Sequence, residues 1–233
     1  MRPGDPLAIE KLFNDVAPIY DHLNDLLSLG LHRVWKKRLL FLLSPMPGEH
    51  WLDLCCGTGD LTLALARKVC PKGTVMGVDS AIEPLLIATK RSSKESFRNL
   101  SWRKGDALDT GLPSNYFDGV VMAYGLRNLA DPQAGLKEVH RVLKPGGRAG
   151  ILDFNQIASN SIRSKFQKFY LRRVVVPIAD KAGLREHYLY LEKSLQKFPQ
   201  GHIQEKLALE IGFKQANHLL LAFSQMGILL LKS

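Results

Sequence analysis

A turn with the sequence LDLCCGTGD follows a short apolar run of the 233-residue chain and opens a helix-like segment at Asp60. Gly57 and Gly59 allow a ligand to approach the backbone closely, and the first N–H groups of a helix are free at the same point. The next apolar run ends in Asp79, 22 residues after Gly57. An acidic side chain at that spacing meets the ribose hydroxyls of an adenosine. The spacing indicates an adenosine site, although a tight turn alone explains the glycines about as well.

A third apolar run leads into the segment KGDALD, which places Asp106 and Ala107 at its exit. A carboxylate there can accept a hydrogen bond from the adenine amino group, while apolar atoms beside it contact the ring. Taken alone, Asp106 after Gly105 is better explained as a turn residue. Three aligned run ends together favour adenosine, because ligands of open α/β sheets lie across the carboxyl ends of the strands.

The residues around the turn match S-adenosylmethionine better than a dinucleotide. Position 62 is Thr, where the dinucleotide fingerprint has a third glycine. Asp53 just before the turn suits a cationic ligand, and S-adenosylmethionine carries a sulfonium and an amino group but no phosphate. Its product would be S-adenosylhomocysteine. The residues expected to bind it are Asp53, Gly57, Thr58, Gly59, Asp79, Ser80, Asp106, Ala107, Ala123 and Tyr124.

The stretch VVMAYGLRNLADP ends an apolar run and then places Arg127 and Asn128 directly after Gly125. Apolar runs of this length ahead of a turn mark buried strands. A guanidinium at such an exit either faces a bound substrate or pairs with Asp131 at the surface of a loop, and the spacing alone favours neither. Arg127 is too basic to remove a proton itself, so a chemical role would be electrostatic.

Short apolar runs alternate with amphipathic segments from Trp51 onward, for example DLTLALARKV and residues 132–142. This alternation predicts an α/β fold with a doubly wound parallel sheet, and the segment HLLLAFSQMGILLLKS predicts a closing antiparallel pair of strands. Residues 7–42 show helical spacing that is interrupted at Pro18 and Gly30. We expect one domain across residues 1–233, with a helical cover at 1–45, a ligand-binding core at 46–155, and helices with the last two strands at 156–233.

The net charge of +10 allows contact with nucleic acid or with an anionic membrane. The segment NSIRSKFQKFYLRRVVVP interleaves basic with aromatic side chains, which suits either partner, and a solvated basic face is the plain alternative. The residues concerned are Arg163, Lys165, Phe166, Lys168, Phe169, Tyr170, Arg172 and Arg173. The three cysteines have neither disulfide-framework nor metal-site spacing, so we expect no metal. The acidic N-terminal region is unlike a transit peptide, and no apolar run reaches the ~18 residues of a membrane span.

The series LDLCCGTGDL, GVD and GDALD resembles the signature of class I S-adenosylmethionine-dependent methyltransferases, which implies a Rossmann-like fold with a seven-stranded sheet. Over essentially the whole chain, further segments are similar to blocks of the UbiE/MenG family of quinone C-methyltransferases. These are FNDVAPIYDHLNDLLSLGLHRVWKKR, YGLRNLADPQAGLKEVHRVLKPGG, REHYLYLEKSLQKFP and LEIGF. The CCGTGD version is similar to the photosynthetic branch, whose product is phylloquinone. Cys55 replaces the usual glycine, and AFSQMGILLLKS replaces a turn that often contains glycine.

The resemblance implies methyl transfer to a ring carbon of a reduced, prenylated quinol, with demethylphylloquinol as the first choice. Demethylmenaquinol and the ubiquinone precursor are alternatives of the same chemistry. It also implies that Arg127 stabilises the phenolate, with Asn128 and Tyr20 as hydrogen-bond partners. A lipophilic naphthoquinol places the protein at a membrane surface, in a chloroplast after loss of a targeting peptide or in the cytoplasm of a bacterium. A homodimer is compatible with this function.

Two other classes of function stay open at this point. An RNA methyltransferase is disfavoured because the segment AYGLRN has neither the Asn/Asp-Pro-Pro-aromatic motif of base N-methyltransferases nor a cysteine nucleophile. We therefore expect no nucleic-acid partner. A non-catalytic S-adenosylmethionine-binding subunit of a quinone-synthesis complex would carry the same cofactor residues and transfer nothing.

Overall fold

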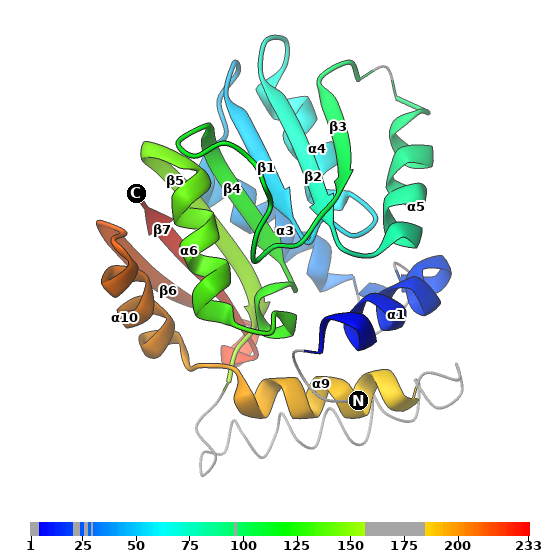
Figure 1. The fold of residues 1–233 in the computed structure, drawn as a ribbon, viewed down its shortest axis with the longest axis vertical. Helices are drawn as coiled ribbons and strands as arrows, with labels where there is room; N and C mark the ends of the chain where they lie inside the picture. Colours follow the sequence, from blue (N-terminus) through cyan, green and yellow to red (C-terminus); the bar gives the residue numbers. More distant parts are fainter. Residues whose placement is uncertain (1–4, 21–23, 26–27, 29, 96, 157–184) are drawn as a thin grey trace.

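The computed structural model describes residues 5–20, 24, 25, 28, 30–95, 97–156 and 185–233 (Figure 1). The basic, aromatic-rich segment at 160–177 and His22 lie outside the described residues. Within the described ranges, none of the helices combines the length and hydrophobicity that crossing a bilayer requires.

The centre of the fold is a seven-stranded sheet with the strand order β3-β2-β1-β4-β5-β7-β6. Its strands are β1 (His50–Leu54), β2 (Thr74–Asp79), β3 (Leu100–Lys104), β4 (Phe117–Ala123), β5 (Leu143–Phe154), β6 (Gln215–Leu221) and β7 (Met226–Lys232). β1 to β5 pair in parallel, and β7 runs antiparallel to both β5 and β6. The expected α/β sheet with a closing antiparallel pair is confirmed. β1 ends at Leu54, directly before Cys55.

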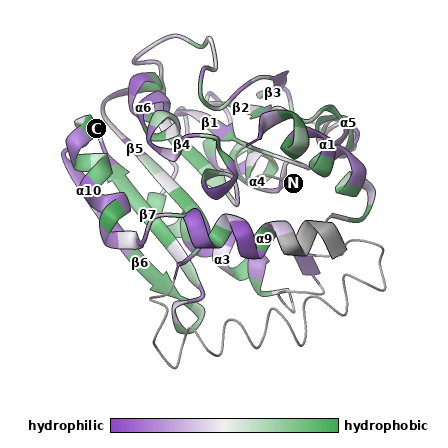
Figure 2. Ribbon diagram, turned by 60° about the horizontal axis from the view of Figure 1, so that its bottom comes forward, coloured by the Kyte–Doolittle hydropathy of each residue, from purple (hydrophilic) through white to green (hydrophobic). Residues whose placement is uncertain are grey.

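The central strands bury side chains on both faces, which explains their nearly continuous apolar sequence. Leu52 and Val120 belong to the apolar cluster on one face, and Trp51 and Val121 belong to the cluster on the other. The colouring by hydropathy shows the hydrophobic strands flanked by helices with hydrophilic outer residues (Figure 2). A polar side chain on such a strand is therefore costly unless it has a partner.

The helices lie on both faces of the sheet (Figure 1). The α3 (Leu31–Leu43), α4 (Asp60–Val69) and α5 (Ile82–Ser92) helices cover one face, and α6 (Pro132–Val142) and α10 (Gly201–Ile211) cover the other. The bounds of α4 and α6 match the amphipathic segments predicted from the sequence. Pro132 occupies the first turn of α6, and Asp131 caps it by accepting hydrogen bonds from the N–H groups of Gln133 and Ala134.

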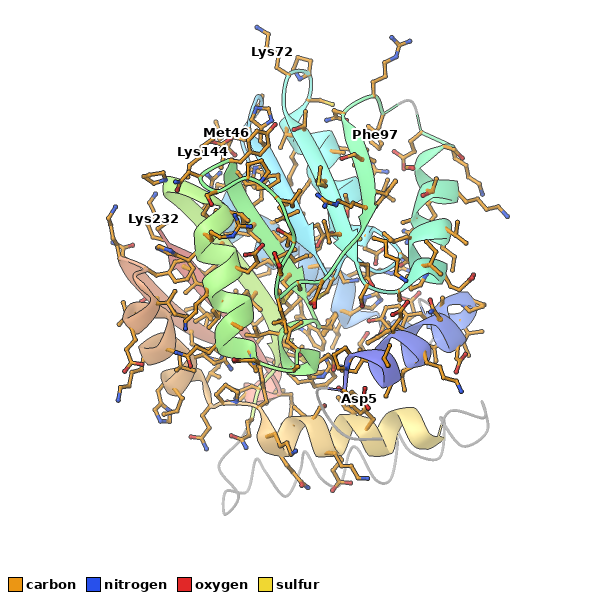
Figure 3. The ribbon with its side chains drawn as sticks, viewed as in Figure 1. Asp5, Met46, Lys72, Phe97, Lys144 and Lys232 are labelled. Carbon is orange, nitrogen blue, oxygen red and sulfur yellow. The ribbon has the colours of Figure 1, made fainter. Side chains whose placement is uncertain are left out.

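The α1 helix (Pro6–Val16) lies at the carboxyl ends of the parallel strands. Met46, Lys72, Phe97 and Lys144, which lie at the amino ends of β1, β2, β3 and β5, are at the opposite end of the sheet from Asp5 at the start of α1 (Figure 3). The Lys104 ammonium at the end of β3 forms an ion pair of 2.6 Å with Glu10 of α1.

The α9 helix (Arg185–Lys197) packs beside α1, since Ile9 and Leu12 form a buried cluster with Tyr190. The short 3-10 helix η1 (Ala17–Ile19) follows α1 at the predicted Pro18 interruption, and Gly30 is the N-cap of α3. The N-terminal helices and α9 therefore cover the edge of the sheet where ligands of this fold class bind.

Candidate active site

A pocket lies at the carboxyl ends of β1 and β4. Its lining includes six of the residues singled out from the sequence, namely Tyr20, Asp53, Gly57, Thr58, Ala123 and Tyr124. It also includes Lys36, Cys55, Cys56, Asp60 and Leu61, which sequence reasoning assigned no ligand role. Both adjacent cysteines therefore border the pocket, although the sequence analysis gave them no part in ligand binding.

The two glycines of the turn are needed for different structural reasons. Gly57 has φ +53°, and a Cβ atom added there would meet nothing within 4 Å, so its missing side chain leaves room on the pocket side. A Cβ atom on Gly59, where φ is +86°, would lie 2.5 Å from the ring of Trp102. Gly57 therefore keeps space for a ligand, whereas Gly59 allows the start of α4 to pack on β3.

Cys55 has φ +56°, a left-handed conformation that is strained for any residue other than glycine. This backbone geometry explains why the family pattern has glycine at this position. Burial raises the pKa of the Cys55 thiol well above its usual value, and nearby carboxylates add to the rise. Those carboxylates belong to Asp79, Asp53, Asp153 and Asp106, in order of decreasing effect. These aspartates lie at or just after the carboxyl ends of four different strands, and the negative charge of each acts on this one thiol.

Asp79 at the end of β2 holds the glycine turn. Its Oδ2 accepts a hydrogen bond of 2.8 Å from the Gly57 N–H, and its Oδ1 accepts one of 2.9 Å from the Ala81 N–H. Burial raises the pKa of Asp79, although these backbone donors act in the opposite direction. Ser80, which follows it, is exposed. The sequence spacing from Gly57 to Asp79 therefore corresponds to a direct contact between the two residues.

Asp53 is almost fully buried at the end of β1, with 1% of its surface exposed. Thr62 donates a hydrogen bond of 2.6 Å to its Oδ2. Burial raises the pKa of Asp53 to about 7, against the favourable hydrogen bond from Thr62 and the positive charge of Lys36. A cationic ligand beside this carboxyl group would favour its ionised form.

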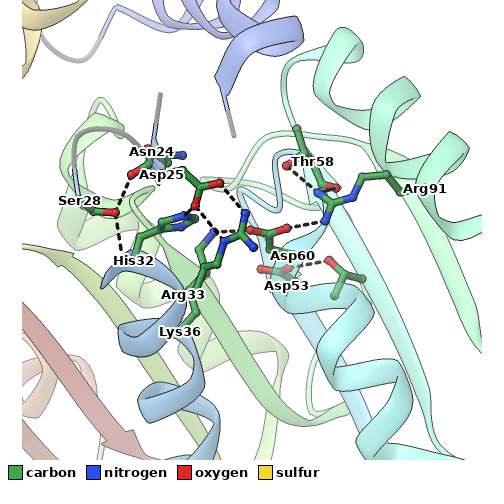
Figure 4. A network of polar contacts seen from close by, with 11 residues as sticks. Asn24, Asp25, Ser28, His32, Arg33, Lys36, Asp53, Thr58, Asp60 and Arg91 are labelled. Atoms are coloured by element: carbon green, nitrogen blue, oxygen red, sulfur yellow. Dashed lines mark hydrogen bonds and ion pairs between the residues drawn. The ribbon is translucent and has the colours of Figure 1, made fainter. Parts of the chain in front are cut away.

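Lys36 and Asp60 join the cover to the glycine turn. The Lys36 ammonium, on α3, donates to Asp60 Oδ2 at 2.9 Å, and Arg91 of α5 binds Asp60 Oδ1 at 2.6 Å (Figure 4). Arg91 also donates to the carbonyl and hydroxyl oxygens of Thr58. Although burial opposes it, the two cations hold the pKa of Asp60 well below its usual range.

The sequence pattern around Lys36 could have predicted that this side chain has a partner. Within LHRVWKKRLLFLL, Lys36 lies four residues after His32 and three and four residues before Leu39 and Leu40, all of which are buried. A lysine on the apolar stripe of a helix requires a partner. Its partner is an aspartate 24 residues further along the chain.

Arg127 lies in the 3-10 helix η2 (Leu126–Asn128) and pairs with Asp153 at the end of β5. Its backbone N–H and its Nη1 donate to the two carboxylate oxygens of Asp153, each at 3.1 Å. Nη1 also donates to the Tyr124 carbonyl at 2.6 Å. The alternative of a surface pair with Asp131 is wrong, since Asp131 caps α6 and the Arg127 side chain is only 10% exposed.

The segment 124–128 contains buried polar atoms without hydrogen-bond partners in the described part of the chain. They are the Tyr124 hydroxyl, Arg127 Nε and Asn128 Oδ1. The Asn128 amide nitrogen donates to the Tyr124 carbonyl at 2.9 Å, so only its oxygen is left. Because unpaired buried polar atoms are costly, this cluster is suited to a ligand that both donates and accepts hydrogen bonds.

Tyr20 approaches the same region from the cover. Its ring packs edge-on against Phe13, with 6.0 Å between the ring centroids. Burial raises the pKa of Tyr20, while the positive charges of Lys36 and Arg127 oppose the rise. The structure therefore brings Tyr20 within electrostatic reach of Arg127, and its part as a hydrogen-bond partner in catalysis stays a prediction.

The residues at the third predicted strand exit, Asp106 and Ala107, do not line the pocket. Asp106 is exposed and accepts a hydrogen bond of 2.9 Å from the Leu108 N–H, which is the contact of a turn residue. Ala107 is buried. Neither residue borders the pocket, and their part in adenine binding stays a prediction. In the described ranges, no three His, Cys, Asp or Glu side chains are grouped as metal ligands would be.

The donor set of this edge of the sheet fits S-adenosylmethionine. The Asp53 and Asp60 carboxylates suit the sulfonium and amino groups, and the space beside Gly57 allows close approach to the backbone. A pyrophosphate would instead lie among carboxylates of its own sign.

Comparison with known proteins gives a family and close relatives. A family model described as the ubiE/COQ5 methyltransferase family matches residues 4–229. A 2-phytyl-1,4-naphtoquinone methyltransferase of Nostoc sp. is 44% identical over 224 residues, covering 96% of this chain and 97% of the relative. A chloroplastic 2-phytyl-1,4-beta-naphthoquinone methyltransferase of Arabidopsis thaliana is 43% identical over 219 residues, covering 93% of this chain and 84% of the relative.

Solved structures share the fold at low sequence identity. An S-adenosylmethionine-dependent methyltransferase from Aquifex aeolicus has a TM-score of 0.62 and 17% identity, covering 84% of this chain and 88% of that one. A phosphoethanolamine N-methyltransferase 2 of Haemonchus contortus has a TM-score of 0.60 and 20% identity, covering 80% of this chain and 38% of that one. These likenesses establish the class I methyltransferase fold.

Proposed function

Because the chain belongs to the ubiE/COQ5 methyltransferase family and is thus an S-adenosylmethionine-dependent methyltransferase, we propose that its acceptor is a 2-phytyl-1,4-naphthoquinol. The methyl group goes to a ring carbon and yields phylloquinol. Relatives named as 2-phytyl-1,4-naphthoquinone methyltransferases support this choice, since they match almost the full chain. The reduced form is the reactive one, because a quinol ring can supply the electron pair that a quinone ring lacks.

The observation that carries the proposal is the cluster of unpartnered polar atoms at Tyr124, Arg127 and Asn128. Of these three residues, Tyr124 lines the pocket together with the cofactor-type residues, and Arg127 and Asn128 lie next to it through their hydrogen bonds to the Tyr124 carbonyl. A quinol hydroxyl both donates and accepts hydrogen bonds, so it can satisfy atoms of either kind.

S-adenosylmethionine, when bound, supplies an electrophilic methyl group on a sulfonium. On the protein side, the Arg127 guanidinium stabilises the phenolate that forms when the quinol hydroxyl loses its proton. With the cofactor bound, the ring carbon beside that oxygen would form the new C–C bond to the methyl group, and the S–CH3 bond would break with its electron pair left on sulfur. The proton on the methylated carbon returns to the oxygen, and one proton is released overall.

Each polar residue of this wall has a distinct task in the proposal. Asp153 fixes the Arg127 side chain through two hydrogen bonds. Asn128 and Tyr20 bind the acceptor oxygen, or a water molecule that carries its proton away. Asp79 and Asp106 bind the adenosine part of the cofactor, and Asp53 faces its cationic part.

The phytyl chain places the acceptor in a bilayer, and we propose that the protein works at the surface of a photosynthetic membrane. The Arabidopsis relative named as chloroplastic and the relatives from cyanobacteria support this setting. The basic segment at 160–177 and a homodimer remain predictions from the sequence. Liposome binding of an Arg172→Gln/Arg173→Gln variant tests the segment, since each charge contributes about 1 kcal/mol on anionic lipid.

A methyl-transfer assay tests the acceptor. Purified protein with labelled S-adenosylmethionine is given 2-phytyl-1,4-naphthoquinone with and without dithionite, then demethylmenaquinol and a benzoquinol precursor. We expect transfer to the reduced phytyl compound. Transfer only to a menaquinol or benzoquinol would reassign the acceptor within the family, and binding without any transfer would indicate a non-catalytic subunit.

A further inference from the structure

The Lys36 side chain of α3 points inward, unlike that of Arg33 on the same helix. Its side chain is 14% exposed, compared with 64% for Arg33 on the same helix. The ammonium lies 5.8 Å from the centre of the Tyr124 ring and 2.9 Å from Asp60 Oδ2. Keeping an ammonium this far from water is costly unless it has a function or a full set of partners.

Asp60 does not require Lys36 for its own neutralisation. Arg91 binds the other carboxylate oxygen of Asp60 at 2.6 Å and is further fixed by two contacts with Thr58 (Figure 4). The Lys36 ammonium has three donors, of which the Asp60 contact uses one. Lys36 can therefore keep Asp60 and bind an additional anionic group.

S-adenosylmethionine brings such a group into an acidic site. Its amino and sulfonium groups suit the carboxylates of the pocket, but its own carboxylate meets Asp53 and Asp60 with the same sign of charge. Of the residues that line the pocket in the described part of the chain, Lys36 is the one with a cationic side chain. Its ammonium, which comes from α3, contacts Asp60 at the start of α4, where free N–H groups also favour an anion.

We propose that Lys36 binds the carboxylate of the cofactor's amino-acid part and so ties the cover helix α3 to the loaded pocket. The inference rests on the proposed function only in taking S-adenosylmethionine as the ligand of this pocket. It adds a residue from the cover to a cofactor site whose other members follow the strands. Because Lys36 belongs to α3, a contact between Lys36 and the cofactor would stabilise the position of the cover.

The test compares ligands that differ only at the carboxylate. Binding of S-adenosylhomocysteine and of its carboxamide is measured by calorimetry on the full chain. We expect Lys36→Met to weaken S-adenosylhomocysteine tenfold to a hundredfold and to leave carboxamide binding as in the wild type. Lys36→Arg should recover part of the loss, since it restores the charge with a different reach. Lys37→Met is the matched control, because Lys37 is exposed on the same helix.

The remaining outcomes separate the inference from the proposed function. Equal weakening of both ligands by Lys36→Met would make Lys36 a structural partner of Asp60 and overturn the inference. No weakening of either ligand would overturn it as well. In both cases the wild-type protein still binds and uses the cofactor. A wild-type protein that binds neither S-adenosylhomocysteine nor S-adenosylmethionine would overturn the proposed function and the inference together. Thermal unfolding of each variant shows whether it is folded.

Discussion

At the carboxyl ends of the strands, the part of the site beside β1 and β2 differs from the part beside β4 in how many of its buried polar groups have hydrogen-bond partners. On the β1 and β2 side, Asp79 and Asp53 accept hydrogen bonds from Gly57, Ala81 and Thr62. On the β4 side, the segment 124–128 keeps three buried polar atoms without partners in the described residues. The first half is therefore preorganised by the chain itself, whereas the second is completed only when a ligand arrives. We interpret the first as the cofactor half and the second as the acceptor half.

The largest expected effect concerns the acceptor half. Arg127→Ala should lower the methyl-transfer rate by about a hundredfold or more, about 3 kcal/mol, because Arg127 acts on charge that develops in the transition state. Calorimetry should show little change in S-adenosylmethionine affinity. Raising the pH should narrow the gap, since the quinol then ionises without help.

Arg127→Lys is the matched variant and should recover only part of the rate, because an ammonium lacks the fixed fork of the guanidinium. Circular dichroism is needed alongside, since either change alters the buried pair with Asp153. A folded Arg127→Ala protein with the wild-type rate across the pH range would remove Arg127 from the acceptor half.

A second prediction concerns the cofactor half. Asp79→Ala should weaken S-adenosylmethionine binding by roughly 1–3 kcal/mol, through lost hydrogen bonds to the ribose and release of the Gly57 N–H. The rate at saturating cofactor should change far less than the affinity. Unchanged affinity of the folded variant, measured by calorimetry, would show that the contact to Gly57 is only structural.

A smaller effect is expected from pH. With the pKa of Asp53 raised to about 7, the free protein carries a neutral Asp53 below that pH, and a bound cation favours its carboxylate. S-adenosylmethionine affinity should therefore rise by up to about tenfold per pH unit below pH 7 and level off above it. Asp53→Asn should remove this slope. Proton release, measured by calorimetry in buffers of different ionisation enthalpy, checks it, and a flat wild-type profile would contradict it.

The smallest expected effect concerns Asp131, which lies next to the acceptor half in the sequence. Asp131→Ala should lower the free energy of unfolding by about 1 kcal/mol, because it removes the N-cap of α6. The transfer rate at a temperature where the variant is folded should equal that of the wild type. Urea unfolding and the transfer assay check the two parts. A slower rate in the folded variant would show that the cap of α6 also helps to hold the acceptor half in place.

The sequence predicted the parts of this architecture that depend on local pattern. Alternating apolar runs located the strands, and the segments that became α4 and α6 were bounded correctly because Asp60, Pro132 and the stripes of apolar residues mark them. Spacing also singled out Asp79, because one βα unit determines its distance from the glycine turn, but the prediction concerned the ribose and not the contact with Gly57.

Contacts between distant segments were not readable in the same way. Arg127 was paired with Asp131 in one interpretation because the two are close in sequence, whereas its partner Asp153 is 26 residues away on the neighbouring strand. Lys36 reaches Asp60 across 24 residues and between two helices. Such pairs depend on how the elements pack, and a single sequence contains no periodicity that reveals them.

The raised pKa of the Cys55 thiol affects how readily the acceptor, in its oxidised form, can modify the protein chemically. A naphthoquinone with an unsubstituted ring carbon is an alkylating agent, and thiolates add to that carbon. Cys55 borders the pocket, but burial and the surrounding carboxylates keep it as the thiol, which is a poor nucleophile. Burial, helped by the carboxylates that suit a cationic cofactor, therefore makes Cys55 less prone to arylation when the acceptor is oxidised.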